Sequence, residues 1–444
     1  MSRLTRNPWL IATVVLLVAI TIAVFTIVKR VPDPEIATTL AQRTPDPARG
    51  QYLAILGDCA FCHTRPDGQA LAGGRPLDSP LGIIYSSNIT PDPDTGIGRY
   101  TFKDFARVMR LGVTPSGTRL YPAMPYTAYA KVSDEDLQDL FAYLQEKIAP
   151  VHEASRATDI TWPLSIRWPL ALWSGAFLDR SRFAVDGSQD AQRNRGGYLV
   201  QGLLHCGTCH TPRGLFYEEK DVSGKTNWYL SGSELDSESP VNLRGNEADG
   251  LGRWSAADIA DLLKSGSNAH SAVMGTMADV VRNSTQYMTD QDLAAVAAFL
   301  KSLSPAPDAG RAHFNPSDST LRSVMAGDEK SAGGLLYMDS CAACHRLSGG
   351  GETLAFPALA GNSSVLSEDP SSLIAVILQG ARAPSTTGAP SGLTMPGFGW
   401  RYDDADIAQL ATFVRSSWGN QVAPVSSSQV STVRKRLDLT PPVH

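Results

Sequence analysis

The chain has 444 residues, of which 43% are hydrophobic and 19% are charged, a composition typical of a folded protein of roughly two to four domains. Its net charge of −5 supplies no basic surface, so nucleic acid is excluded as an expected partner. The 38 Gly and 29 Pro indicate long loops between short helices.

An apolar segment opens the chain. Trp9 to Val28 reads WLIATVVLLVAITIAVFTIV and contains no charged residue. As a helix it would be about 30 Å long, the thickness of a bilayer core. A cleaved signal peptide is the alternative, since Arg3 and Arg6 precede the run. Because the run is longer than a signal core and no small-residue cleavage site follows, we expect a retained transmembrane helix.

The cysteines occur only as pairs, and each pair is followed by a histidine in the pattern C-x-x-C-H. The three motifs are Cys59, Cys62 and His63; Cys206, Cys209 and His210; and Cys341, Cys344 and His345. This spacing lets two cysteines form thioethers to one porphyrin while the histidine binds its iron. A zinc site would need two further ligands, and a redox dithiol has no use for the histidine. The sequence therefore predicts three covalent haems c.

Haem c is attached outside the bacterial cytoplasm, which orients the N-terminal segment. We expect a protein of the inner (cytoplasmic) membrane with a single N-terminal anchor. Its haem domains would then face the periplasm.

The surroundings of the three motifs repeat. Arg49–Thr64 (RGQYLAILGDCAFCHT) matches Arg195–Thr211 (RGGYLVQGLLHCGTCHT), and AGGLLYMDSCAACHR is a looser third copy. A second helix in each copy ends at a glycine, namely Gly112, Gly266 and Gly380. A closing amphipathic helix begins in each copy at a variant of the capping box: Ser133 with Asp136, Thr289 with Asp292, and Asp403 with Asp406. The pattern predicts an all-α fold with three domains in tandem after one transmembrane helix.

The sixth iron ligand is expected in the loop before each closing helix. Met124 and Met395 both precede proline, in a stiff loop that can hold a thioether over iron. The second copy offers Met277, which we prefer, Met274, or His270 as a bis-histidine alternative. A haem with an open sixth position, expected in this copy, would instead act as a peroxidase.

The repeats divide the chain into seven parts. They are an N-terminal membrane anchor (1–37), domain 1 (38–150), a Trp-rich linker (151–185), domain 2 (186–304), a linker (305–324), domain 3 (325–419) and a polar C-terminal tail (420–444). The Trp-rich linker either packs on its neighbours or forms a docking face for a partner subunit or a quinone. Dinucleotide, P-loop, zinc-protease and nucleophile-elbow motifs are absent from the sequence, so we expect no catalysis on an organic substrate.

Several phrases resemble the triple-haem cytochrome c subunits of bacterial membrane-bound dehydrogenases. They are NITPDPDTGIGRYTFKDF, YPAMPYTAYAKVSDEDLQDLFAYL, RWPLALW and STQYMTDQDLAAVAAFLKSL. That family serves alcohol, gluconate, sorbitol and molybdenum-type aldehyde dehydrogenases, and the apparent anchor favours the last. The resemblance implies cytochrome c-like domains, with His63, His210 and His345 as proximal ligands and Met124, Met277 and Met395 as distal ligands.

The same resemblance implies a function and partners. The protein would be a non-catalytic subunit that relays electrons from a periplasmic dehydrogenase, oxidising an aldehyde or alcohol, to ubiquinone or the respiratory chain. Its partners would be a molybdenum-, PQQ- or flavin-containing catalytic subunit and an iron–sulfur subunit where one exists, with ubiquinone or a terminal oxidase as acceptor. The alternative is a stand-alone, membrane-tethered cytochrome c that donates to a terminal oxidase or reductase.

Overall fold

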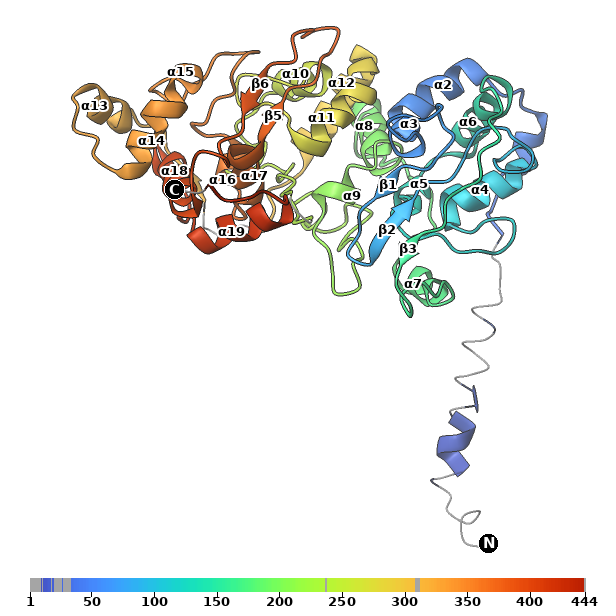
Figure 1. Ribbon diagram of the computed structural model, residues 1–444. Helices are drawn as coiled ribbons and strands as arrows, with labels where there is room; N and C mark the ends of the chain where they lie inside the picture. The colour runs from blue at the N-terminus through green and yellow to red at the C-terminus, as the bar shows by residue number, and fades with distance from the viewer. Residues whose placement is uncertain are drawn as a thin grey trace, which may run out of the picture. The chain divides into compact units, whose positions relative to one another are not determined.

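The computed structural model describes residues 33–235, 238–307 and 312–442, together with 9, 11–16, 18–19 and 26 (Figure 1). The described chain forms two compact units. The first contains the residues up to Gly50 and Cys62–Arg182, and the second contains Gln51–Phe61 and the residues from Phe183 onward.

Short helices joined by long loops make up the first unit. Its helices are η2 (Thr38–Gln42), the start of α2 (Pro47–Leu56), the end of α3 (Cys59–His63), α4 (Phe102–Leu111), α5 (Tyr126–Tyr129), α6 (Asp134–Glu146) and α7 (Leu170–Phe177). Thr101 caps α4 in a full capping box with Asp104. The helix ends, as predicted, at a left-handed Gly112. The buried faces of α4 and α6 form the core around Phe105, Leu137 and Leu140.

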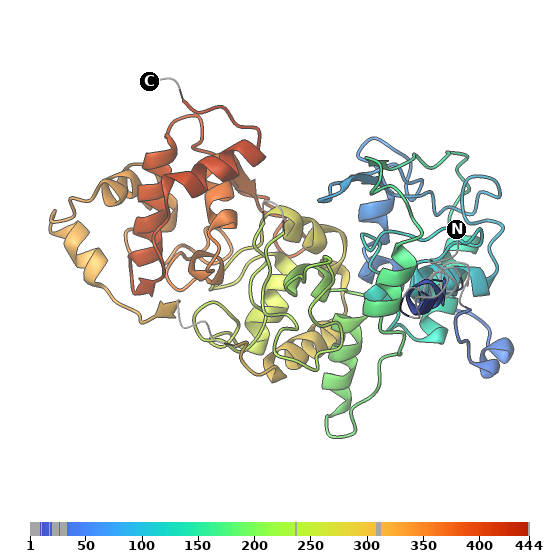
Figure 2. The same cartoon turned by 90° about the horizontal axis from the view of Figure 1, so that it is seen from below.

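The second unit contains the two later copies of the repeat. The middle copy has α8 (Ala191–Gln201), α9 (Gly207–His210), α10 (Ala256–Ser265), α11 (Gly275–Asn283), η3 (Thr285–Tyr287) and α12 (Asp290–Ser302). The last has α13 (Ser319–Met325), α14 (Ala332–Ser340), α15 (Ala342–His345), α16 (Ser363–Leu366), α17 (Ser371–Gln379), α18 (Asp404–Ser416) and α19 (Ser427–Arg436). Helix α8 packs on α12. Helix α18 packs against both α14 and α19, in the orange-to-red part of Figure 2.

The same close helix crossing occurs in all three copies. A Cβ on Gly50 would lie 2.0 Å from the carbonyl oxygen of Asp139, and one on Gly196 would lie 2.0 Å from that of Ala295. The third copy repeats this crossing at Gly333, with 2.2 Å to Gln409. Only glycine therefore allows the helix before each haem motif to touch the closing helix backbone to backbone.

The closing helices begin at the predicted caps. The Ser133, Thr289 and Asp403 side chains each accept a backbone N–H three residues on. None of the three closing helices forms the reciprocal capping box that α4 has. Asp292 instead accepts two hydrogen bonds from Arg195 of α8, at 2.8 and 2.9 Å, so the carboxylate joins two helices.

The prediction of an all-α fold is wrong. β1 (Pro76–Leu77), β2 (Gly82–Tyr85) and β3 (Asp159–Ile160) form an antiparallel sheet, with Leu77 opposite Ile84 and Ile83 opposite Asp159. Two antiparallel pairs lie in the second unit: β4 (His313–Phe314) with β7 (Asn420–Gln421), and β5 (Gly380–Arg382) with β6 (Thr394–Pro396). These strands are too short to show a period-two pattern; they form where loops meet and pair their backbone groups.

The predicted N-terminal anchor, and with it the inner-membrane location, is also corrected. Within the described residues, no helix is long and apolar enough to cross a membrane. The hydropathy of a run of residues does not by itself establish a membrane-spanning helix. The other residues of the run from Trp9 to Val28 lie outside the described part. The preference for the aldehyde dehydrogenase type, which depended on this anchor, loses its basis.

The C-terminal segment is packed rather than free. Within 420–444, expected as a polar tail, α19 buries Val430 and Val433 against the third copy. Arg434, 2% exposed, donates to the carbonyl oxygens of Gly399 at 2.6 Å and Tyr402 at 2.9 Å. The end of the chain therefore completes the core of the third copy.

Candidate functional site

Each C-x-x-C-H motif lies on a short helix at the end of a longer one. The motifs occupy α3, α9 with Cys206 just before it, and α15 with Cys341 just before it. None of the six cysteines is in a disulfide. The residues that precede the first two motifs, Asp58 and His205, have φ of 49° and 38°, so the backbone turns sharply into each motif.

The three motif histidines are held in the same way. The ring Nδ1 lies 2.7 Å from the carbonyl oxygen of Ser87 for His63, and 2.7 Å from that of Val241 for His210. For His345 the partner is the Pro357 carbonyl, at 2.9 Å. A carbonyl only accepts, so Nδ1 carries the proton and Nε2 keeps its lone pair. In metal sites generally, a hydrogen bond from the ring nitrogen that does not bind the metal fixes the orientation of the imidazole. The Nδ1 contacts of these three histidines are of that kind.

Burial keeps the same rings neutral. It lowers the pKa of His63, His210 and His345, and the backbone hydrogen bonds act weakly in the opposite direction. Burial also raises the pKa of Cys206 to about 12 and that of Cys209 to about 11. Thiols with such raised pKa values stay protonated near neutral pH. Because a redox dithiol needs a thiolate, this disfavours the redox-dithiol interpretation.

The surroundings of the second motif fit a haem. Among the described residues, the Tyr229 hydroxyl and the Trp254 indole N–H are buried without a hydrogen-bond partner. Tyr229 lies against the motif, because a Cβ on Gly207 would be 3.1 Å from its ring. A buried donor without an acceptor costs about 1–3 kcal/mol. The carboxylates of a haem would supply an acceptor for the Tyr229 hydroxyl, so this residue and the motif are consistent with a haem site.

The sequence did not identify Tyr229 or Trp254. Aromatic residues in loops are typical of ordinary cores, and only the absence of a partner distinguishes these two. The carbonyl partners of the histidines were not identifiable either, because every residue has a carbonyl.

Two of the predicted distal methionines have a constrained backbone, Met124 in a tight turn and Met395 in a short strand. The Met124 carbonyl accepts the Tyr126 N–H at 2.7 Å, so the chain turns tightly at this residue. Met395 lies in β6 opposite Ala381 of β5. Both side chains are half-buried.

In the second copy the candidates differ in their surroundings. The His270 ring stacks on Trp254, with centroids 5.3 Å apart and planes at 16°, and its Nε2 lies 3.4 Å from the Asp258 carboxylate. Met274 is the N-cap of α11, whereas Met277 lies in its first turn and packs against the Val273 cluster. Since the His270 ring already has partners on its face and its edge, the surroundings favour a methionine.

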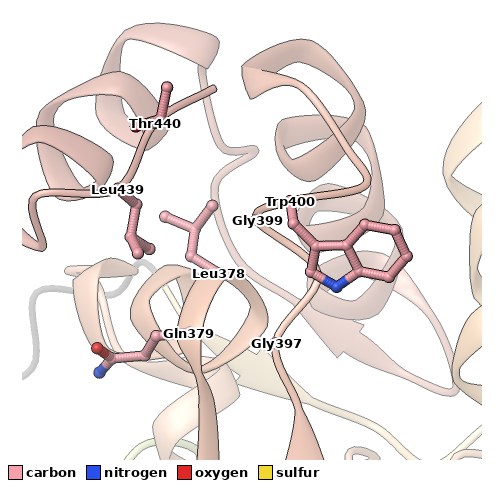
Figure 3. A pocket seen from close by; sticks show the side chains of 7 residues that line it. All are labelled: Leu378, Gln379, Gly397, Gly399, Trp400, Leu439 and Thr440. Atoms are coloured by element: carbon pink, nitrogen blue, oxygen red, sulfur yellow. The ribbon is translucent and has the colours of Figure 1, made fainter. Parts of the chain in front are cut away.

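A separate cavity of 380 Å³ lies in the third copy (Figure 3). Leu378 of α17, Gly397, Trp400 and Leu439 are among its lining residues. Figure 3 shows Leu378 between Leu439 and the turn at Gly399. No motif cysteine or histidine lines it, so this cavity is distinct from the candidate haem site.

Comparison with known proteins gives a consistent pattern. The cytochrome c family matches residues 195–304 and 331–418, which are the second and third copies. The chain is 46% identical over 393 residues to the gluconate 2-dehydrogenase cytochrome c subunit of Pantoea cypripedii, covering 87% of this chain and 89% of that protein. It is 45% identical to the cytochrome c subunit of the quinone alcohol dehydrogenase of Gluconacetobacter polyoxogenes (89% and 86% covered). It is 36% identical to the fructose dehydrogenase cytochrome subunit of Gluconobacter japonicus (90% and 85%).

Proposed function

Because the chain belongs to the family of cytochrome c subunits of dehydrogenases, an electron-transfer rather than a catalytic family, we propose that it carries three covalent haems c and relays electrons from a dehydrogenase to ubiquinone or another respiratory acceptor. Each haem would be attached through one C-x-x-C-H motif. The three haem domains would be residues 38–150, 186–304 and 325–419, with α19 packed on the last of them.

The observation that carries this proposal is the threefold anchoring of His63, His210 and His345 to backbone carbonyls. Each ring presents Nε2 as the free ligand atom. The cytochrome c family match covers the second and third copies, and the first copy has the same motif and the same anchored ring. This shared geometry supports three haems rather than two.

The proposed distal ligands are Met124, Met277 and Met395. A thioether ligand raises the potential of a haem relative to bis-histidine ligation. That direction suits a relay that accepts electrons from a dehydrogenase.

The dehydrogenase partner is proposed from the relatives. The relatives named above belong to gluconate, alcohol and fructose dehydrogenases, which act on different substrates. Their cytochrome subunits are nevertheless 36–46% identical to this chain. We therefore assign the choice of substrate to the catalytic subunit and not to this chain.

The test is a haem count and a co-purification. The pyridine haemochrome of the pure chain should give three haems per protein, and the variant with Cys59→Ala and Cys62→Ala should give two. Two haems in the unaltered chain would contradict the count. Purification from the native host should recover a dehydrogenase catalytic subunit; recovery with only oxidase subunits would favour the stand-alone cytochrome.

A further inference from the structure

His205 lies directly before the second C-x-x-C-H motif, and the proposed function assigns it no role. It precedes Cys206, where the other copies have Asp58 and Ser340. Its left-handed backbone is held on both sides, since its N–H donates to the Gly202 carbonyl at 3.1 Å and its carbonyl accepts the Thr208 N–H at 2.9 Å. A histidine with φ of 38° is uncommon, so the backbone around it is fixed by its neighbours.

The ring of His205 reaches a segment that is far away in sequence. It is hydrogen-bonded to the backbone of Gly57, two residues before Cys59. Burial lowers the pKa of His205, whereas hydrogen bonds from the ring to the backbone of Gly57 and to its own backbone raise it, as expected when a ring N–H donates to a carbonyl. Gln51–Phe61 belongs to the same compact unit as His205.

Neighbouring contacts show why this bond matters. The last carbonyls of a helix have no partner within the helix, and α2 ends at Leu56. The Leu56 carbonyl accepts the Ser284 hydroxyl at 3.1 Å, in a buried position. One turn earlier, the Tyr52 hydroxyl donates to Asp292 at 2.8 Å. Residues of the second copy therefore complete the end of the helix that leads to Cys59.

We propose that His205 is a positioning residue that fixes the segment carrying Cys59 against the segment carrying Cys206. It would also provide the hydrogen-bonded step of an electron route between the two attached haems. The route runs from Cys206 through His205 across one hydrogen bond to Gly57, and then through Asp58 to Cys59. With a haem on each motif, this route would carry one electron from a ferrous to a ferric iron, and no proton would move. This inference rests on the proposed function, since it needs a haem on each motif.

The experiment compares holoprotein variants at one position. His205→Phe keeps a ring but removes the donor. His205→Asn and His205→Gln place an amide N–H near the positions of Nδ1 and Nε2. His313→Phe, at an exposed histidine of the same unit, is the control. If His205→Phe does not fold, His205→Gly replaces it, because glycine adopts the left-handed backbone freely.

Two measurements decide the outcome. Hydrogen exchange of the peptide covering residues 51–61 should accelerate about fivefold in His205→Phe, the factor that corresponds to a lost hydrogen bond of about 1 kcal/mol. Electron redistribution between haems after pulsed reduction should slow several-fold. An amide variant should restore both values, and His313→Phe should change neither.

The inference is overturned if His205→Phe leaves both rates unchanged, or if exchange accelerates without any change in electron redistribution. It is equally overturned if neither amide variant restores them. A haem count below three in the unaltered protein would contradict the proposed function instead, and is measured separately on the same samples.

Discussion

The Nδ1 atom of His210 lies 2.7 Å from the carbonyl oxygen of Val241, thirty-one residues further along the chain. This contact determines which nitrogen of the ring is free, and His63 and His345 repeat it with carbonyls 24 and 12 residues away. The spacing to the partner differs in every copy while the geometry is the same. Loops of different lengths can place a backbone carbonyl beside the ring. The contact therefore depends on the tertiary structure and not on a fixed spacing in the sequence.

The sixth ligand of the second haem gives the first prediction. Met277→Ala should convert one of the three haems to a high-spin ferric form, because the iron loses its thioether. Met274→Ala and His270→Gln should leave all haems low-spin, since the His270 ring is engaged by Trp254 and Asp258. Optical and electron paramagnetic resonance spectra of the ferric proteins provide the measurement. A high-spin haem in either control variant would move the ligand to that residue, and one in the unaltered protein would favour the peroxidase alternative.

A second prediction concerns Tyr229, whose hydroxyl is buried. If it donates to a haem carboxylate, Tyr229→Phe should destabilise the holoprotein by about 1 kcal/mol. It should also lower the midpoint potential of one haem, because a less compensated negative charge stabilises ferric iron. Redox titration and thermal unfolding test both effects. Tyr287→Phe, at a residue 53% exposed, is the control and should change neither. A neutral or stabilising Tyr229→Phe would mean that the hydroxyl has no acceptor in the holoprotein.

The bond between Asp292 and Arg195 predicts a pH dependence of stability. Burial raises the pKa of Asp292, but hydrogen bonds from Arg195 and Tyr52 outweigh it and hold the pKa below its ordinary value. The contribution of Asp292 is therefore complete above its unfolded pKa of about 3.9 and is lost as the pH falls through the folded value. Asp292→Asn should cost about 1.5–3 kcal/mol at pH 7 and progressively less in acid.

Chemical denaturation at several pH values measures this difference. Asp290→Asn is the matched control, because its side chain is 97% exposed on the same helical turn. It should change the free energy of unfolding by less than about 0.5 kcal/mol. A cost for Asp292→Asn that does not shrink in acid would show that the charge of Asp292 is not what stabilises the crossing.

The glycine crossing gives the fourth prediction. Gly196→Ala places a Cβ 2.0 Å from the carbonyl oxygen of Ala295, so α8 and α12 must separate. We expect a loss of about 1–3 kcal/mol in stability, as for an overpacked core. Gly175→Ala in α7, where a Cβ meets nothing within 4 Å, should instead stabilise by roughly 0.5–1 kcal/mol. Thermal unfolding compares the two, and equal effects would contradict the backbone contact.

Local features of the fold were predictable from the sequence. The caps at Ser133, Thr289 and Asp403 and the helix ends at Gly112 and Gly266 depend on residues a few positions apart. The strands were not predictable, because each is short and exists only where two loops meet. The apolar N-terminal run shows the same limit, since its composition alone did not establish a membrane-spanning helix.

By itself the sequence predicted the chemistry that we propose for this protein. The three C-x-x-C-H motifs, each preceded by a helix, can be found by spacing because thioether attachment would constrain residues that are neighbours in the chain. The tertiary structure decided which nitrogen each histidine presents, that the buried Tyr229 lies against the second motif and how His205 meets Gly57. Those contacts join positions tens to more than a hundred residues apart, and a backbone carbonyl leaves no mark in the sequence that would reveal its partner.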